Sequence, residues 1–156
     1  MSPKDLKTIH FLNKLLDAGV SILKIEGRAR SAEYVKTVSS CYNEAIFAYV
    51  DGTFNADKIK DWDERLAGVF NRGFWDGYYL GKKLGEWSEQ YGSSATKRKV
   101  YIGKGMNYFS KLGVAEFLVE SGQLETGDSI LISGPTTGVI ECSAKEMQVD
   151  YKKVDK

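Results

Sequence analysis

The sequence has few of the residue types that build disulfide scaffolds, metal clusters or membrane spans. It contains two cysteines, two prolines and one histidine, His10, among 156 residues. Cys41 and Cys142 form neither a CxxC pair nor a Cys/His group, so we predict free thiols and no metal site. No apolar run reaches the ~20 residues that cross a bilayer, and the N-terminus lacks the apolar segment of a secretory signal. We therefore expect a cytoplasmic protein that does not enter a membrane.

The small net charge and the single histidine exclude further classes. The net charge is +1, so no whole-chain field favours nucleic acid or an anionic membrane. With one imidazole, the sequence contains no Ser/His/Asp, Cys/His or HExxH constellation. His10 is expected to be a satisfied or exposed helix residue rather than a ligand.

An apolar run followed by glycine and arginine is the most informative segment that is present. Val20 to Ile25 is predicted to be a short buried strand, and Gly27 breaks the run. Arg28 then follows, and Ser31 is suited to begin a helix. Because ligands of α/β enzymes bind at the carboxyl ends of strands, we expect the guanidinium of Arg28 at such a mouth.

Three helices are predicted in the first part of the chain. The first begins at Ser2, with Pro3 and Asp5 in its first turn, and ends at Gly19. The second begins at Ser31 and ends at Gly52, and apolar residues recur in it at helical spacing. A third helix is expected after Asn55, which is a suitable N-cap.

The later part of the chain changes character. Asn71 to Gly81 is rich in glycine and aromatic residues, which indicates a tight loop or bulged strand, and Glu86 to Thr96 reads as a linker. Short strands separated by turn residues then predict a small barrel or sandwich; they are 100–102, 108–109, 114–119, 129–133, 138–142 and 146–149. The predicted fold class is α+β, with a mainly helical domain over 1–95 and an antiparallel β domain over 96–156.

Several segments resemble the collagenase-like peptidase family, peptidase family U32, in order and spacing over nearly the whole chain. The shared elements are Ser2–Leu6, Asp17–Val20, Leu23–Arg28, Tyr34–Val35, Phe70–Phe74, Lys111–Glu116 and Gly134–Gly138. Leu-Lys-Ile-Glu-Gly-Arg and Phe-Asn-Arg-Gly-Phe are the most specific of them.

The resemblance implies a fold for each part. Val20–Glu26 would be the last strand of a TIM-type barrel, with Asp5–Ala18 as the helix before it and Ser31–Val50 as the helix after it. The later strands, including Gly122–Asp128, would form part of a truncated barrel similar to the second domain of translation elongation factors. One strand without neighbours leaves unpaired backbone groups, so a homo-oligomer through this strand is expected.

The sequence departs from the family pattern in two ways. The cysteine- and glycine-rich signature of the family lies upstream of the matched region, so we expect a fragment of the catalytic barrel that is inactive alone. Many members have a cysteine, considered as a metal ligand, where this chain has Lys7. The chain is expected to bind no cofactor itself, whereas the complete family protein is expected to use a prephenate-derived co-substrate and an iron–sulfur cluster or zinc.

The family name implies a peptidase acting on collagen-like substrates, while other members resemble enzymes that hydroxylate uridine in tRNA. We favour prephenate-dependent tRNA uridine hydroxylation, because a cationic anion site suits that reaction better than proteolysis. The remaining alternatives are a peptidase and a non-catalytic module that binds RNA or a protein.

The predicted site residues have structural alternatives. Arg28, with Arg30 and Arg72, is expected to bind a small organic acid, since a guanidinium can hold a carboxylate by two parallel hydrogen bonds. Glu26 is either a catalytic base or a salt-bridge partner of Arg28, which could also pair with Glu33.

The basic and aromatic residues carry a second set of expectations. Lys97, Arg98 and Lys99 either contact RNA phosphates or form a solvated run. The rings of Trp62, Phe70, Phe74 and Trp75 belong either to the core or to a base-stacking surface.

Overall fold

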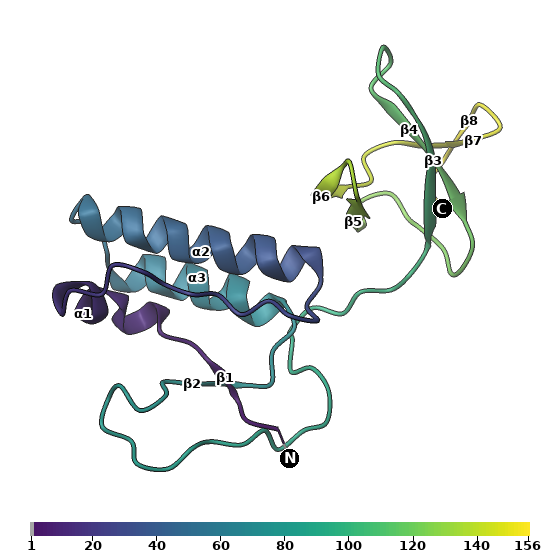
Figure 1. Ribbon diagram of the computed structural model, residues 1–156. Helices are drawn as coiled ribbons and strands as arrows, with labels where there is room; N and C mark the ends of the chain where they lie inside the picture. The colour runs from purple at the N-terminus through teal and green to yellow at the C-terminus, as the bar shows by residue number, and fades with distance from the viewer. Residues whose placement is uncertain (1) are drawn as a thin grey trace. The chain divides into compact units, whose positions relative to one another are not determined.

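The chain folds into two compact units that divide between Arg98 and Lys99 (Figure 1). The computed structural model describes residues 2–156. The first unit holds the helices and the second holds antiparallel hairpins, so the α+β class predicted from the sequence is confirmed. No helix in the described residues is both long and apolar enough to span a bilayer.

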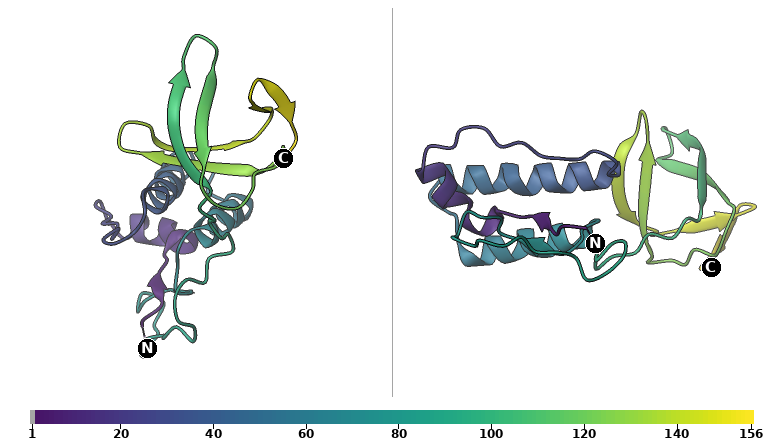
Figure 2. Two further views of the ribbon diagram at one scale, coloured as in Figure 1. Left: turned by 90° about the vertical axis from the view of Figure 1, so that its right-hand side faces the viewer. Right: turned by 60° about the horizontal axis from the view of Figure 1, so that its bottom comes forward.

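The first unit is built around two long helices that lie side by side (Figures 1 and 2). Its elements, in chain order, are β1 (Asp5–Leu6), a 3-10 helix (Ile9–Phe11), α1 (Leu12–Asp17), α2 (Ala32–Val50), α3 (Ala56–Gly68) and β2 (Phe74–Trp75). The predicted second and third helices therefore form where the sequence indicates. Asn55 accepts a hydrogen bond from the backbone N–H of Lys58 at 3.0 Å, as an N-cap does.

The core of this unit lies between α2, α3 and the short N-terminal helices. Cys41 and Ala45 of α2 are fully buried, and their small side chains let Trp62 of α3 pack closely against α2. The indole N–H of Trp62 donates to Glu44 at 3.0 Å, and Arg65 pairs with the same carboxylate at 2.5 Å. The two helices are thus joined by apolar packing inside and by a charged clamp at the surface.

The predicted start of the first helix is wrong. Asp5–Leu6 is a strand instead, paired in parallel with Phe74–Trp75. The backbone N–H of Asp5 donates to the carbonyl of Gly73 at 2.9 Å, next to the paired residues of the two strands. A pairing with a segment distant in the chain therefore overrides the local capping signal. The predicted end is right, since Gly19 follows α1 with a φ of +88°, a conformation that favours glycine.

The predicted strand at Val20–Ile25 is also wrong. This segment has no regular structure, and no backbone hydrogen bond joins residues 21–26 to the rest of the described chain. It runs beside α2 (Figures 1 and 2), with Leu23 against the core and Ile22 84% exposed. A strand forms only where a neighbour supplies hydrogen bonds, and residues 2–156 place none here. A remnant of a TIM-type barrel is therefore not confirmed.

The second unit consists of three separate hairpins. They are β3–β4 (Gly103–Phe109 and Val114–Val119), β5–β6 (Ser129–Gly134 and Gly138–Ser143) and β7–β8 (Met147–Val149 and Lys152–Val154). The strand expected at 100–102 begins at Gly103 instead. The hairpins form two-stranded sheets that do not join into a closed barrel, because each strand pairs with its neighbour across a short turn.

The cap of α3 can be tested against a matched position. We expect Asn55→Ala to lower the free energy of unfolding by about 1 kcal/mol, because it removes the cap of the Lys58 N–H. Ser31 occupies the N-cap position of α2, but its hydroxyl donates to Glu33 at 2.5 Å and makes no cap bond. Ser31→Ala should therefore cost less. Urea unfolding followed by helical circular dichroism measures both, and equal losses would contradict the capping argument.

The two cysteines should differ sharply in reactivity. Cys41 is fully buried, and burial raises the pKa of its thiol to about 11, so almost no thiolate exists at neutral pH. Cys142 is exposed in the second unit. Iodoacetamide at pH 7.5 followed by peptide mass spectrometry should label Cys142 in the folded protein and Cys41 only in urea. Equal labelling of both in the folded protein would be inconsistent with this packing.

Candidate functional site

The guanidinium of Arg30 lies against two aromatic rings in the first unit. Its central carbon is 4.0 Å from the centre of the Phe70 ring and 5.6 Å from the centre of the Tyr34 ring. The side chain of Arg30 is 14% exposed, and its Nη2 atom is 3.4 Å from Oδ1 of Asp5. Stacking on rings fixes the plane of the guanidinium, so its N–H donors point in defined directions.

The carboxylate of Asp5 connects this arginine to the segment after α3. Its second oxygen accepts the backbone N–H of Arg72 at 2.9 Å. Asn71, which is buried, holds that segment in place through bonds to the carbonyls of Ala67 and Val69 and from the N–H of Gly73. Arg72 therefore contributes to the site through its backbone.

The guanidinium has donors beyond those that its neighbours use. Of its five N–H donors, one is 3.4 Å from Asp5, which is long for a charge-assisted bond, and the hydroxyl of Tyr34 also interacts with the guanidinium. Burial and the charge of Asp5 raise the pKa of Tyr34, partly offset by Arg30, so its hydroxyl keeps its proton at neutral pH. A cavity of about 40 Å³, which has room for a group the size of a water molecule, is lined by Asp5, Tyr34 and Phe70, the three residues that Arg30 contacts, and not by Arg30 itself. The arrangement therefore places a stacked cation beside a small cavity.

Arg28, which the sequence analysis made the first candidate for binding an anion, does not line this cavity. Arg28 is exposed, and Glu26 pairs with Lys24 at 2.9 Å in an equally exposed position. Ala29 has a φ of +58°, which is unusual for a residue with a side chain, in a turn closed by the Arg30 N–H and the Gly27 carbonyl at 3.0 Å. Of the three predicted arginines, the structure brings Arg30 and Arg72 together and leaves Arg28 outside.

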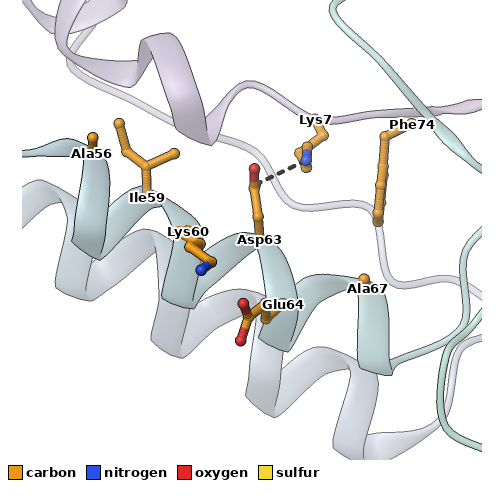
Figure 3. Close-up of a pocket in the computed structure, with 8 residues that line it drawn as sticks. All are labelled: Lys7, Ala56, Ile59, Lys60, Asp63, Glu64, Ala67 and Phe74. Carbon is orange, nitrogen blue, oxygen red and sulfur yellow. Dashed lines mark hydrogen bonds and ion pairs between the residues drawn. The ribbon is translucent and has the colours of Figure 1, made fainter.

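A larger, open groove adjoins the small cavity along α3 (Figure 3). It measures about 460 Å³ and is lined by Lys7, Ala56, Ile59, Lys60, Asp63, Glu64, Ala67 and Phe74. Lys7 points toward Asp63, with 2.8 Å between Nζ and Oδ1, and its ammonium lies 4.7 Å from the centre of the Phe74 ring. Lys7 and Phe74 line both cavities, so they stand between the groove and the Arg30 site.

The basic cluster predicted to contact RNA stands where the two units meet in the sequence. Lys97 and Arg98 end the first unit and Lys99 begins the second. The second unit has seven lysines and eight acidic residues, and ion pairs such as Lys104–Glu120 at 2.7 Å neutralise part of its charge. The contact of Lys97, Arg98 and Lys99 with RNA stays a prediction.

Sequence reasoning missed Asp5 as the counter-ion of Arg30 and missed Tyr34 as its second ring. Tyr34 is close to Arg30 in the sequence, but no local signal could have shown Asp5, because 25 residues separate it from Arg30 and 67 separate it from Arg72. The aromatic residues divide as the alternatives allowed: Trp62 is buried core, while Phe70 supports the arginine.

The cysteines do not suit an iron–sulfur cluster or a zinc site. Cys41 is enclosed in the core of the first unit and Cys142 belongs to the second. Within residues 2–156 no three His, Cys, Asp or Glu side chains are grouped as ligands would be. Lys7, where the family resemblance suggested a ligand, is engaged with Asp63.

Comparison with known proteins gives consistent matches to one family. The model of peptidase family U32 matches residues 1–89. The chain is 63% identical over its whole length to a protein named collagenase from Porphyromonas gingivalis, of which it covers 38%. It is 37% identical over 99% of its length to an uncharacterized protease of Methanocaldococcus jannaschii, of which it also covers 38%. It is 34% identical over 86% of its length to tRNA hydroxylation protein P1 of Bacillus subtilis, of which it covers 32%.

The chain thus spans about two fifths of the length of the curated relatives named collagenase. No solved structure matches it. The family model covers more than half of the chain, and the resemblance seen in its sequence motifs extends over the same residues. The chain belongs to peptidase family U32.

Proposed function

We propose that the protein to which this chain belongs hydroxylates uridine in tRNA, with Arg30 binding a carboxylate of a prephenate-derived co-substrate. The observation that supports the proposal is the guanidinium of Arg30, which is held on the Phe70 ring and has donors beyond those facing Asp5 and Tyr34. Relatives named tRNA hydroxylation proteins, from Bacillus subtilis and Haemophilus influenzae, each align with 86% of this chain. A small carboxylic acid is the ligand that such a guanidinium binds best.

The role of the described residues would be to bind and orient. A ligand carboxylate would take two parallel N–H bonds from Arg30, and the hydroxyl of Tyr34, which stays protonated, could donate a third. Asp5 would limit the site to one anion by holding the other side of the guanidinium. The chemistry of the reacting carbon would depend on residues outside this chain.

A peptidase is the second candidate, favoured by the name of the relatives at 63% identity. Within the described chain, the imidazole and one of the two thiols are already engaged. Nε2 of His10 is 3.1 Å from Asp76, and the thiol of Cys41 is buried and protonated, whereas Cys142 is exposed in the second unit. A peptidase would therefore need a nucleophile other than Cys41.

Gene disruption tests the hydroxylation proposal. Deleting the gene that encodes this chain should remove hydroxylated uridine from tRNA, as measured by mass spectrometry of nucleosides, and the native gene should restore it. An Arg30→Met allele should restore about tenfold less hydroxylated uridine than the native gene does, or less still, since a hydrogen bond to a charged group contributes ~1.5–3 kcal/mol. Unchanged tRNA in the deletion strain would refute the proposal.

Two further alleles make the arginine assignment specific. Lys14→Met removes an exposed charge from α1 and should restore the modification fully. Arg28→Met should have a smaller effect than Arg30→Met, because Arg28 is exposed and lies outside the cavity. A larger loss at Arg28 would support the assignment made from the sequence and overturn the one made from the geometry. Cleavage of heat-denatured collagen by the purified full-length protein, with tRNA unchanged in the deletion strain, would establish the peptidase instead.

A further inference from the structure

The loop after β2 carries aromatic side chains that are largely exposed and are not part of the core. This loop, residues 76–88, is called the aromatic loop below. It carries Tyr78, Tyr79 and Trp87, whose exposed fractions are 62%, 61% and 56%. Exposed rings concentrated in a short segment indicate a binding surface rather than packing.

The aromatic loop is anchored at its C-terminal end to the N-terminal segment. The N–H of Lys4 donates to the carbonyl of Glu86 at 3.0 Å, and the N–H of Ser88 donates to that of Ser2 at 2.8 Å. Pro3 and Trp87 form an antiparallel bridge between these bonds. The loop is therefore fixed to the first unit and does not hang free.

Two of the exposed rings are also held by ring contacts. Tyr79 lies 6.2 Å from the buried ring of Phe11, and Tyr78 meets Trp75 edge-on at 5.2 Å. Each contact leaves more than half of the tyrosine exposed. Rings held in this way lose little conformational freedom when a flat ligand stacks on them.

Lysines accompany the exposed rings of the aromatic loop, and the formal charges of residues 76–88, which are Asp76, Lys82, Lys83 and Glu86, cancel. Glu86 binds both Lys4, at 2.8 Å, and Lys82, so these three residues carry a net charge of +1. The two ammonium groups hold the pKa of Glu86 at about 2, so the charge persists at all physiological pH values. Lys83 adds a further positive charge. Flat aromatic faces beside lysines are the combination that proteins use to bind single-stranded nucleic acid.

We propose that the aromatic loop binds unpaired nucleotides of RNA, with bases stacked on Tyr78, Tyr79 and Trp87 and phosphates near Lys82 and Lys83. The identity of that RNA as the tRNA substrate rests on the proposed function, whereas the stacking surface does not. Leu84, which is 82% exposed in the same loop, makes a protein the rival occupant. A surface that binds a protein should not bind single-stranded oligonucleotides, so an oligonucleotide probe distinguishes an RNA-binding surface from a protein-binding one.

Fluorescence anisotropy with labelled oligouridine, using the 156-residue chain, tests the proposal. Tyr78→Ala with Tyr79→Ala should weaken binding about tenfold or more, because each stacked base contributes substantially. Tyr78→Phe with Tyr79→Phe should retain binding, since stacking uses the ring and not the hydroxyl. The matched control is Tyr101→Ala with Tyr108→Ala, which removes two tyrosines of 61% and 64% exposure from the second unit and should leave binding unchanged.

Lys83→Ala guards against a variant that fails to fold, because it alters an exposed side chain that holds no structural contact. It should weaken oligouridine binding and make it less dependent on salt. The same oligouridine annealed into a duplex should bind more weakly than the single strand.

Each result separates this proposal from the proposed function. Failure of the wild-type chain to bind oligouridine, or equal binding by the Tyr78/Tyr79 alanine variant, overturns the surface, even if deletion of the gene removes hydroxylated uridine. Ring-dependent binding with unchanged tRNA in the deletion strain supports the surface and refutes the hydroxylation. Equal loss in the Tyr101/Tyr108 control would also overturn it, since the effect would not belong to the aromatic loop.

Discussion

One carboxylate, that of Asp5, connects three parts of the first unit that are far apart in the sequence. Its oxygens hold the Arg30 side chain and the Arg72 backbone, and its own N–H joins the strand that follows Gly73. A partly buried carboxylate must have such partners, because an unpaired charge away from water is strongly unfavourable. The position of the arginine, the turn after α3 and the β1–β2 pair are therefore not independent features. The first two satisfy the carboxylate of Asp5, and the third uses the backbone of the same residue.

The parts of the fold that could be predicted are those that local chemistry determines. The α2 and α3 helices follow from apolar spacing and, for α3, from the cap at Asn55, and most of the hairpin strands follow from alternation between turn residues. The errors in secondary structure arise where a segment needs a neighbouring strand for its backbone hydrogen bonds and the sequence does not show whether one is present. Asp5–Leu6 has such a partner in Phe74–Trp75 and becomes a strand. Val20–Ile25, with equally good strand composition, has none within the described chain.

The same distinction applies to the candidate site. The sequence named Arg28, Arg30 and Arg72 as residues that bind an organic anion, which stays a prediction; in the structure Arg30 is enclosed and Arg28 is exposed. Residue type could not separate the two, since both follow the same glycine. Their surroundings could, because Phe70 and Tyr34 enclose one and leave the other in water. For the aromatic residues, the sequence left core and base stacking open; Trp62 is core, while Tyr78 and Tyr79 after Trp75 are among the exposed rings.

The backbone at Ala29 has a wider consequence. With a φ of +58°, this residue reverses the local handedness of the chain between the two arginines. The backbone conformation of Ala29 then decides which of the two guanidinium groups is enclosed. A sequence alignment compares residue types and does not show this conformation. Relatives that keep both arginines but favour a right-handed conformation between them would present the opposite one. Shared residues in this motif would then not guarantee a shared specificity.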